Sequence, residues 1–232
     1  MIELIHMDCM DYMATLPDGA FDLAVVDPPY GIGGDSLHTA RKKETFSNFV
    51  KHPTRSERGR LSRGAGKLKN SALQNMDTTW DIAPGPEYFR ELFRVSRNQV
   101  VWGGNYFTAK LPESRCWLLW DKEQPWTNFS AFELAWTSFH KPCQKFKWRN
   151  GSGQNQKRIH PTQKPVALYA WIYSLFAKPG LRILDTHLGS GSSAIAAHDA
   201  GLDFTGCELN TDYFNAAKER YGKHQQQGRL DL

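Results

Sequence analysis

Short apolar runs alternate along this chain with longer stretches in which apolar residues recur every three or four positions. The first pattern is typical of buried strands and the second of amphipathic helices. The strands predicted in this way lie at about residues 2–7, 21–26, 99–103, 115–120, 132–139, 182–186 and 203–208, and the helices near 9–15, 84–96, 165–177, 192–200 and 211–221. Strands that alternate with helices form mostly parallel sheets with helices on both faces. We therefore expect a single α/β domain over residues 1–232.

Two segments interrupt this alternation and are rich in basic residues. Between residues 35 and 80 there is little periodicity, and the stretch from Arg41 to Lys69 holds ten Lys or Arg against two acids. Residues 140–160 mix Lys and Arg with aromatic side chains. A charge run can be a solvated loop without a partner, but a long aperiodic insertion in a compact domain is commonly functional.

The charge balance favours an anionic partner for these segments. The chain has 29 Lys plus Arg against 24 Asp plus Glu and a net charge of +5, which makes nucleic acid the first candidate. Cations interleaved with aromatic rings suit phosphate and base contacts together. We expect residues 35–80 to form a DNA-contacting insertion and residues 140–160 a target-recognition segment. The residues expected to contact double-stranded DNA are Arg41, Lys42, Lys43, Arg55, Arg58, Arg60, Arg63, Lys145, Lys147, Trp148 and Arg149.

Cysteine usage and hydropathy exclude several classes of protein. The four cysteines are dispersed without a Cys-x-x-Cys pair, so the sequence predicts neither a zinc site nor a disulfide framework. No apolar run approaches the 18 residues that a membrane span needs, and the first ten residues carry acids where a signal peptide would be basic and then apolar. We expect a cytoplasmic protein that uses no metal and no membrane.

The C-terminal third contains a pattern typical of nucleotide-binding sites, RILDTHLGSGSSAIAAHDAGLDFTGCELN. A predicted strand ends at Asp185, a loop carries Gly189 and Gly191, and the next predicted strand ends at Glu208. Glycines let a ligand approach the N-terminus of the following helix, and the second acid can accept both ribose hydroxyls. The spacing also fits a dinucleotide fingerprint. Asp185 favours S-adenosylmethionine, because an acid there can hold its amino group but would repel a pyrophosphate.

A second motif, Asp27-Pro28-Pro29-Tyr30, follows the predicted strand 21–26 directly. By itself it could be a turn. Together with the glycine loop and with HPTQKP at residues 160–165, it resembles the β-class, circularly permuted amino-DNA methyltransferases, in which the catalytic tetrapeptide precedes the cofactor glycines. The resemblance covers nearly the whole chain, and VVWGGNYF and CWLLWDK resemble prophage-borne members. It implies a Rossmann-like methyltransferase sheet with inserted basic loops.

The resemblance implies that Asp27, Pro28, Pro29 and Tyr30 are catalytic. The amine of a flipped base would donate its two N–H groups to the Asp27 carboxylate and the Pro28 carbonyl, which leaves its lone pair free, while Tyr30 stacks on the base. The residues expected to bind S-adenosylmethionine, with S-adenosylhomocysteine as product, are Asp8, Cys9, Asp27, His160, Thr162, Lys164, Asp185, His187, Leu188, Gly189, Ser190, Gly191, Ser192, Glu208, Leu209 and Asn210.

The chain departs locally from the family, which usually has Asp-Pro-Phe-x-Gly-Ser-Gly where this chain has DTHLGSG at residues 185–191, so that His187 stands in place of Phe. The ring could pack flat, or it could add a titratable group beside the cofactor. Asp27 favours adenine N6 as the target, because the N4-cytosine members usually begin the tetrapeptide with Ser. The alternatives are an N4-cytosine enzyme, an RNA or protein N-methyltransferase, and a dinucleotide-binding or purely DNA-binding protein. We expect a solitary enzyme, or one of a restriction-modification pair, that acts as monomer or homodimer in a bacterial or phage-infected cell.

Overall fold

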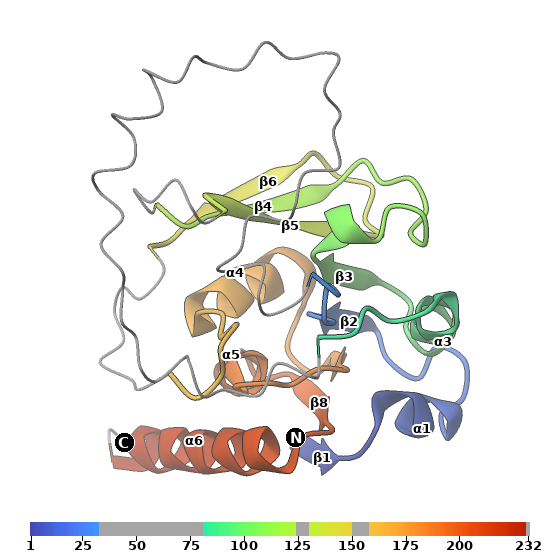
Figure 1. Ribbon diagram of the computed structural model, residues 1–232. Helices are drawn as coiled ribbons and strands as arrows, with labels where there is room; N and C mark the ends of the chain where they lie inside the picture. The colour runs from blue at the N-terminus through green and yellow to red at the C-terminus, as the bar shows by residue number, and fades with distance from the viewer. Residues whose placement is uncertain (33–80, 124–129, 150–157, 231–232) are drawn as a thin grey trace, which may run out of the picture. The chain divides into compact units, whose positions relative to one another are not determined.

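A computed structural model describes residues 1–32, 81–123, 130–149 and 158–230. The chain divides into one compact unit of residues 1–31 and 82–232 and a second of residues 32–81, most of which lies outside the described residues. The described strands are β1 (Ile2–His6), β2 (Leu23–Val26), β3 (Gln99–Trp102), β4 (Trp117–Asp121), β5 (Phe132–Thr137), β6 (Gln144–Lys147), β7 (Arg182–Asp185) and β8 (Asp203–Glu208). They form one sheet in the order β1-β8-β7-β2-β3-β5-β4-β6 (Figure 1).

The sheet is mixed, with β5 as its antiparallel member. β5 runs antiparallel to both of its neighbours, β3 and β4, while the other neighbouring strands pair in parallel. The predicted mostly parallel α/β sheet is therefore confirmed. Each predicted strand and helix is present, with ends that shift by a few residues. Strand β6 was not predicted, and the last helix continues to Leu230 instead of ending near residue 221.

Helices cover both faces of the sheet, as predicted. They are α1 (Cys9–Ala14), α3 (Pro86–Val95), α4 (Val166–Phe176), α5 (Ser192–Asp199) and α6 (Thr211–Leu230), with a short 3₁₀ turn η3 (Gly104–Tyr106) after β3. Helices α1 and α3 pack together on one face, and α4 and α5 pack together on the other (Figure 1). Each face therefore has its own apolar core.

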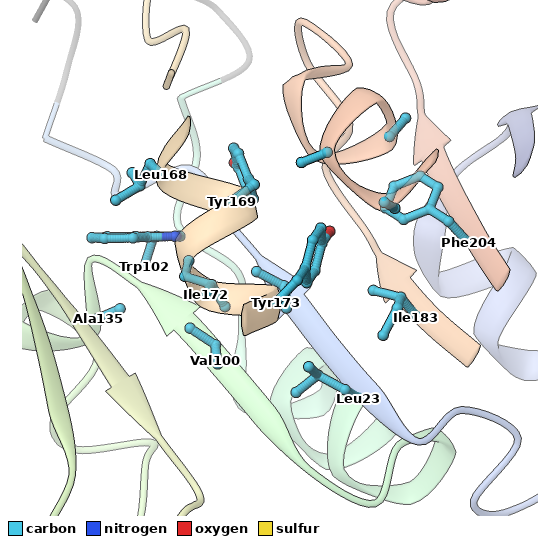
Figure 2. Packing of buried hydrophobic residues seen from close by; sticks show 14 of the residues in the cluster. Leu23, Val100, Trp102, Ala135, Leu168, Tyr169, Ile172, Tyr173, Ile183 and Phe204 are labelled. Atoms are coloured by element: carbon cyan, nitrogen blue, oxygen red, sulfur yellow. The ribbon is translucent and has the colours of Figure 1, made fainter. Parts of the chain in front are cut away.

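The alternation of side chains along the central strands supplies both cores. In β2, Leu23 and Val25 belong to the core under α4, whereas Ala24 and Val26 belong to the core under α1 and α3. All four residues are buried, which explains why the strand reads as an unbroken apolar run. Figure 2 shows α4 lying over the first of these cores, where its side chains meet those of Leu23 and of neighbouring strands. The nearly all-apolar sequence of α4 is thus explained by burial.

Acidic residues line the carboxyl edge of the parallel strands. Asp8 follows β1, Glu208 ends β8, Asp185 ends β7 and Asp27 follows β2, so the four acids succeed one another in the order of the strands. Because β5 is antiparallel, its beginning lies at this same edge and brings Glu133 there. In open α/β sheets ligands bind outside this edge, where the strand order reverses, which here is between β7 and β2.

Candidate active site

The Asp27-Pro28-Pro29-Tyr30 segment leaves the sheet directly after β2. The Tyr30 hydroxyl donates a hydrogen bond of 2.7 Å to Asp27 Oδ1. The Tyr30 ring stacks on Tyr106, with centroids 4.9 Å apart and planes 20° apart, and meets the edge of Phe107 at 6.2 Å. Tyr106 is half exposed. The Asp27 carboxylate therefore lies beside an aromatic surface that solvent can reach.

Gly103, which follows β3, allows Tyr30 to take this position. It has a φ of +66°, in the left-handed region that favours glycine. A Cβ built on Gly103 would lie 2.1 Å from Cε1 of Tyr30. The tyrosine ring therefore occupies space that a side chain at residue 103 would fill.

Lys164 joins this cluster from the segment that precedes α4. Its amine is hydrogen-bonded to Asp27 Oδ2, lies 3.2 Å from Glu133 Oε2, and is 3.4 Å from the Tyr30 hydroxyl. The side chain is only 3% exposed. Burial opposes the charged form, but the carboxylates of Asp27 and Glu133 outweigh burial and raise the pKa of Lys164 above its ordinary value. The amine is therefore a buried ammonium. The sequence motif placed Lys164 among the cofactor-binding residues, whereas its contacts here are with the predicted catalytic pair.

Glu133 and Lys122 extend the cluster away from the Asp27-Pro28-Pro29-Tyr30 segment. Glu133 Oε1 lies 2.5 Å from Lys122 Nζ. Burial raises the pKa of Glu133, but the positive charges of Lys164 and Lys122 outweigh burial, so the pKa of Glu133 is lowered. Neither residue was identified from the sequence. The only signal was a single acid in the otherwise apolar FELAWT strand, which the pattern alone could not distinguish from a surface position.

Asp185, at the end of β7, is the most deeply buried acid of the carboxyl edge. It is 1% exposed, its Oδ2 accepts a hydrogen bond of 2.6 Å from Ser193 Oγ, and its Oδ1 accepts one of 3.0 Å from the His187 backbone N–H. Burial raises the pKa of Asp185 to about 7 in spite of these two donors. A cationic group placed beside this carboxyl would offset the cost of its ionisation.

The glycine loop is fixed from both sides. Glu208 accepts hydrogen bonds from the backbone N–H groups of Gly189 (2.8 Å) and Asn210 (2.9 Å), although burial raises its pKa. Arg220 of α6 donates to the Ser190 carbonyl and to Ser192 Oγ, both at 2.8 Å. With Leu188 buried behind it, the loop is held as a rigid turn before α5.

His187 lies next to this loop as a neutral ring. Burial lowers its pKa to about 4, although Asp8 opposes the change. Its Nδ1 is 2.9 Å from Thr186 Oγ1, and its ring meets the edge of Tyr88 at 5.5 Å. Of the two alternatives considered from the sequence, these contacts favour a packed, uncharged ring over a group that titrates near neutral pH.

His160 and Thr162 support the loop from its other side. A Cβ on Gly189 would lie 3.7 Å from the His160 ring, and that ring meets Tyr213 at 4.4 Å. Burial, with a contribution from Lys164, lowers the pKa of His160 to about 4. Its Nδ1 accepts a hydrogen bond of 3.3 Å from the Thr162 backbone N–H. Both residues thus stand beside the predicted cofactor loop.

The remaining predicted cofactor residues lie at the ends of β1 and β8. Asp8 caps α1 by accepting a 2.7 Å hydrogen bond from the Met10 backbone N–H, and burial raises the pKa of the next residue, Cys9, to about 12. Asn210 caps α6 through Oδ1, while Leu209 is 65% exposed. The structure therefore places these residues, with Asp185 and the glycine loop, along the ends of β1, β8 and β7, whereas Asp27 follows β2 and Lys164 contacts Asp27.

The predicted DNA-contacting residues fall into two groups. Those in the first basic segment, from Arg41 to Arg63, lie outside the described residues. In the second, the side chains of Lys145 and Lys147 are exposed on β6, and Lys145 pairs with Asp121 at 2.9 Å. Arg149 is exposed as well.

Trp148, in the same segment, packs differently from its basic neighbours. Its ring is stacked on Phe146, with centroids 5.9 Å apart, and both rings pack against the core beneath α4. In this segment the basic side chains are therefore exposed, whereas the aromatic rings that alternate with them are partly buried.

Within the described ranges, no group of three or more His, Cys, Asp or Glu side chains could hold a metal ion. The helices of the same ranges include none that is long and apolar enough to cross a membrane.

Comparisons with known proteins identify the family and the fold of this chain. A family model described as DNA methylase, N6_N4_Mtase, matches residues 38–219. The Escherichia coli (strain K12) protein YubD is 27% identical over 220 residues, which are 95% of this chain and 90% of YubD. Among solved structures, the M1.HpyAVI–SAM complex has a TM-score of 0.56 and 19% identity, covering 95% of this chain and 98% of that one.

The PvuII DNA methyltransferase, described as cytosine-N4-specific, has a TM-score of 0.60 and 13% identity, with 97% of this chain and 90% of that chain covered. At these identities the solved structures show a shared fold. Because the family model matches more than half of the chain, the chain belongs to the N6/N4 DNA methylase family.

Proposed function

We propose that this chain transfers a methyl group from S-adenosylmethionine to the exocyclic N6 amine of an adenine flipped out of duplex DNA. The observation that carries the proposal is the placement of Asp27 and Asp185 at the carboxyl ends of the neighbouring parallel strands β2 and β7. Neighbouring strands are about 4.8 Å apart, so an amine acceptor and a cofactor-binding acid stand next to each other.

The carboxyl edge supports S-adenosylmethionine as the methyl donor. Asp185 is a buried carboxyl that a ligand ammonium would stabilise, and Glu208, at the end of the next strand, is positioned for the ribose hydroxyls. Gly189 and Gly191 have φ values of +51° and +73°, so the loop between them turns closely in front of α5. When bound, this cofactor supplies a methyl group on a positively charged sulfonium.

The catalytic segment supports attack by an amine. Aromatic amines are weak nucleophiles because their lone pair is delocalised into the ring. If Asp27 and the Pro28 carbonyl each accept one N–H, the lone pair turns out of the ring plane and toward the methyl group. When bound, the cofactor would supply the methyl group and leave as a neutral thioether, its carbon–sulfur bond breaking as the amine nitrogen bonds to the carbon. Asp27, or water, would then accept the proton that the methylated amine loses.

The aromatic residues beside Asp27 support a flipped base. Flipping costs a few kcal/mol of stacking and pairing, which new stacking in the site can offset. Tyr30 is held against Asp27, and Tyr106 presents an exposed ring next to it. We propose that these two rings receive the base.

The choice of adenine over cytosine rests on Asp27, because N4-cytosine members of the resembled family usually have Ser at this position. The same resemblance supports assignment to the circularly permuted β class, since residues 27–30 precede the glycine loop at residues 189–191. The exposed cations Lys145, Lys147 and Arg149 support contact with the DNA backbone. The prophage origin and the role as a solitary enzyme are part of the same proposal.

Analysis of methylated nucleosides tests the proposal. Unmethylated duplex DNA is incubated with the protein and labelled S-adenosylmethionine, digested to nucleosides and separated. N6-methyladenine is the expected product, and N4-methylcytosine would overturn the adenine assignment alone. Label in RNA or protein but not in DNA would overturn the substrate class.

A further inference from the structure

We propose that Lys164 is a positioning residue that holds Asp27 as a correctly oriented acceptor, and that Glu133 fixes Lys164 in place. This inference rests on the proposed function and adds two residues to its machinery. It differs from the cofactor-binding role that the sequence suggested for Lys164, and it assigns a role to Glu133, which the sequence did not single out.

Three side-chain oxygens of the described residues surround the Lys164 amine. An ammonium has three N–H donors and no acceptor. Its Nζ is hydrogen-bonded to Asp27 Oδ2 and to the Tyr30 hydroxyl at 3.4 Å, and it forms an ion pair with Glu133 Oε2 at 3.2 Å. The amine also lies over the faces of the Trp102 and Tyr30 rings, 5.4 and 5.8 Å from their centroids. These contacts leave the buried amine little freedom to move.

Asp27 keeps room for a substrate amine in this arrangement. Its Oδ1 accepts from the Tyr30 hydroxyl and its Oδ2 from Lys164. A carboxylate has about four lone-pair sites, so each oxygen can accept one more hydrogen bond. The two internal donors therefore fix the plane of the carboxylate and leave one acceptor site open on each oxygen.

Glu133 is needed because Lys164 is buried deeply. A buried ammonium is stable only when paired and hydrogen-bonded, and Glu133 provides a second carboxylate beside Asp27. Lys122, paired with Glu133 at 2.5 Å, balances the additional negative charge. The chain of contacts therefore ties Asp27, which follows β2, to Glu133 on β5 and to Lys122, which follows β4.

The surrounding groups make this an electrostatic role as well as a steric one. Among the described residues, the titratable groups that interact with Lys164 are Asp27, Tyr30, Glu133 and His160, and Asp27 also faces Asp185, Tyr88 and Tyr169. His160 is neutral near pH 7, because its pKa is about 4. Loss of the Lys164 charge would leave Asp27 and Glu133 as neighbouring anions without the cation between them, which favours protonation of a carboxylate.

The test compares Lys164→Met, Glu133→Gln and the double variant in single-turnover methyl transfer to duplex DNA, after the wild-type protein has been shown to methylate DNA. Lys164→Met is expected to lower the rate about a hundredfold, since misplacement of a reacting group by 1 Å can cost that much. The acidic limb of its pH–rate profile should move up by about 1–3 pH units. Its affinity for S-adenosylhomocysteine should stay close to that of the wild type.

Glu133→Gln keeps an oxygen for Lys164 and should lower the rate less. Because Glu133 acts through Lys164, the double variant should be no slower than Lys164→Met alone. A matched control is Lys223→Met, which removes an exposed lysine paired with Glu219 at 2.6 Å on α6 and should leave rate and pH profile unchanged.

Three outcomes would overturn the inference while leaving the proposed function intact. These are a wild-type pH profile in Lys164→Met, single-variant losses that multiply in the double variant, and a loss in Lys164→Met that is confined to cofactor affinity. If Lys164→Met does not fold, Glu133→Gln decides the question, and an unchanged rate and acidic limb in that variant would reject the inference. Absence of DNA methylation by the wild-type protein would instead refute the proposed function itself.

Discussion

The buried Asp185 makes the pH dependence of cofactor binding a specific prediction. Its pKa of about 7 comes from burial, against which Ser193 and the His187 backbone N–H act only in part. In the proposed site, the ammonium of the cofactor's methionine moiety would bind best to the ionised carboxylate. At pH 6 about one tenth of the Asp185 carboxyls would be ionised, so the affinity should be about tenfold lower than its limit at higher pH.

The assay is isothermal titration of the wild-type protein with S-adenosylhomocysteine, which carries the same amino-acid moiety, between about pH 5.5 and pH 8.5. Affinity should rise through pH 7 and level off only above it, and it should fall again as the ligand amine loses its proton near and above pH 8. Asp185→Asn should bind more weakly by about 1.5–3 kcal/mol at pH 7.5, the range for a hydrogen bond to a charged group. The rise between pH 6 and pH 7 should be absent from this variant.

The same raised pKa predicts the opposite effect on the stability of the ligand-free protein. Because the folded state holds the Asp185 proton up to about pH 7 and the unfolded chain releases it near 3.8, ionisation costs the folded state progressively between these values. The full cost is at most about 4 kcal/mol. Asp185→Asn should therefore melt higher than wild type at pH 8, with the difference vanishing toward pH 4. The assignment of Asp185 to the cofactor ammonium would be refuted if the affinity for S-adenosylhomocysteine did not change with pH and Asp185→Asn melted lower than wild type at pH 8.

Three further variants test other parts of the proposed site and DNA interface. Gly103→Ala should lower the rate of methyl transfer by about a hundredfold with cofactor affinity retained, because its Cβ would collide with the Tyr30 ring; a wild-type rate would contradict this. Tyr106→Ala should weaken binding of DNA that carries an unpaired target base by about 1–3 kcal/mol, the value of one base–aromatic stack, and equal affinities would exclude the ring from the base site. Neutralising Arg58, Arg60 and Arg63 together should reduce the slope of log affinity for duplex DNA against log salt concentration by up to about 2.7. This is about 0.9 for each phosphate that one of these arginines neutralises. A slope equal to that of wild type would remove these arginines from the DNA interface.

The parts of the fold that depend on local pattern could be predicted from the sequence. Strand β2 is buried on both faces and reads as an apolar run, and β7 and β8 end at Asp185 and Glu208 as expected. These elements follow from periodicity and from turn residues, which are local properties of the chain. For the same reason the acids that end neighbouring strands could be assigned to one edge.

Contacts between distant segments could not be predicted in this way. Lys164 and Asp27 are 137 positions apart, and Glu133 belongs to a third segment, so no spacing rule connects them. Family resemblance grouped Lys164 with the cofactor residues because it lies in the same motif as His160. Its burial against two carboxylates depends on how α4 and β5 approach β2, which only the three-dimensional structure shows.

Strand β6 was missed for a different physical reason. Its sequence, QKFK, alternates a basic residue with a polar or aromatic one, and it is too short to distinguish from a loop. It is stabilised by parallel pairing with β4 and by the packing of Phe146 and Trp148 against α4, where Phe146 stacks on Trp171 at 5.1 Å. The aromatic residues that suggested base contacts thus also have a packing role.

The central claim is that Asp27 acts on the target amine while Asp185 holds the cofactor. Its most direct test is single-turnover transfer of labelled methyl to duplex DNA by wild type, Asp27→Ala and Asp185→Asn at saturating S-adenosylmethionine, with cofactor affinity measured in parallel. We predict that Asp27→Ala binds cofactor nearly as the wild type does but transfers no detectable methyl group, and that Asp185→Asn recovers substantial transfer once saturated. Near-wild-type transfer by Asp27→Ala would contradict the claim.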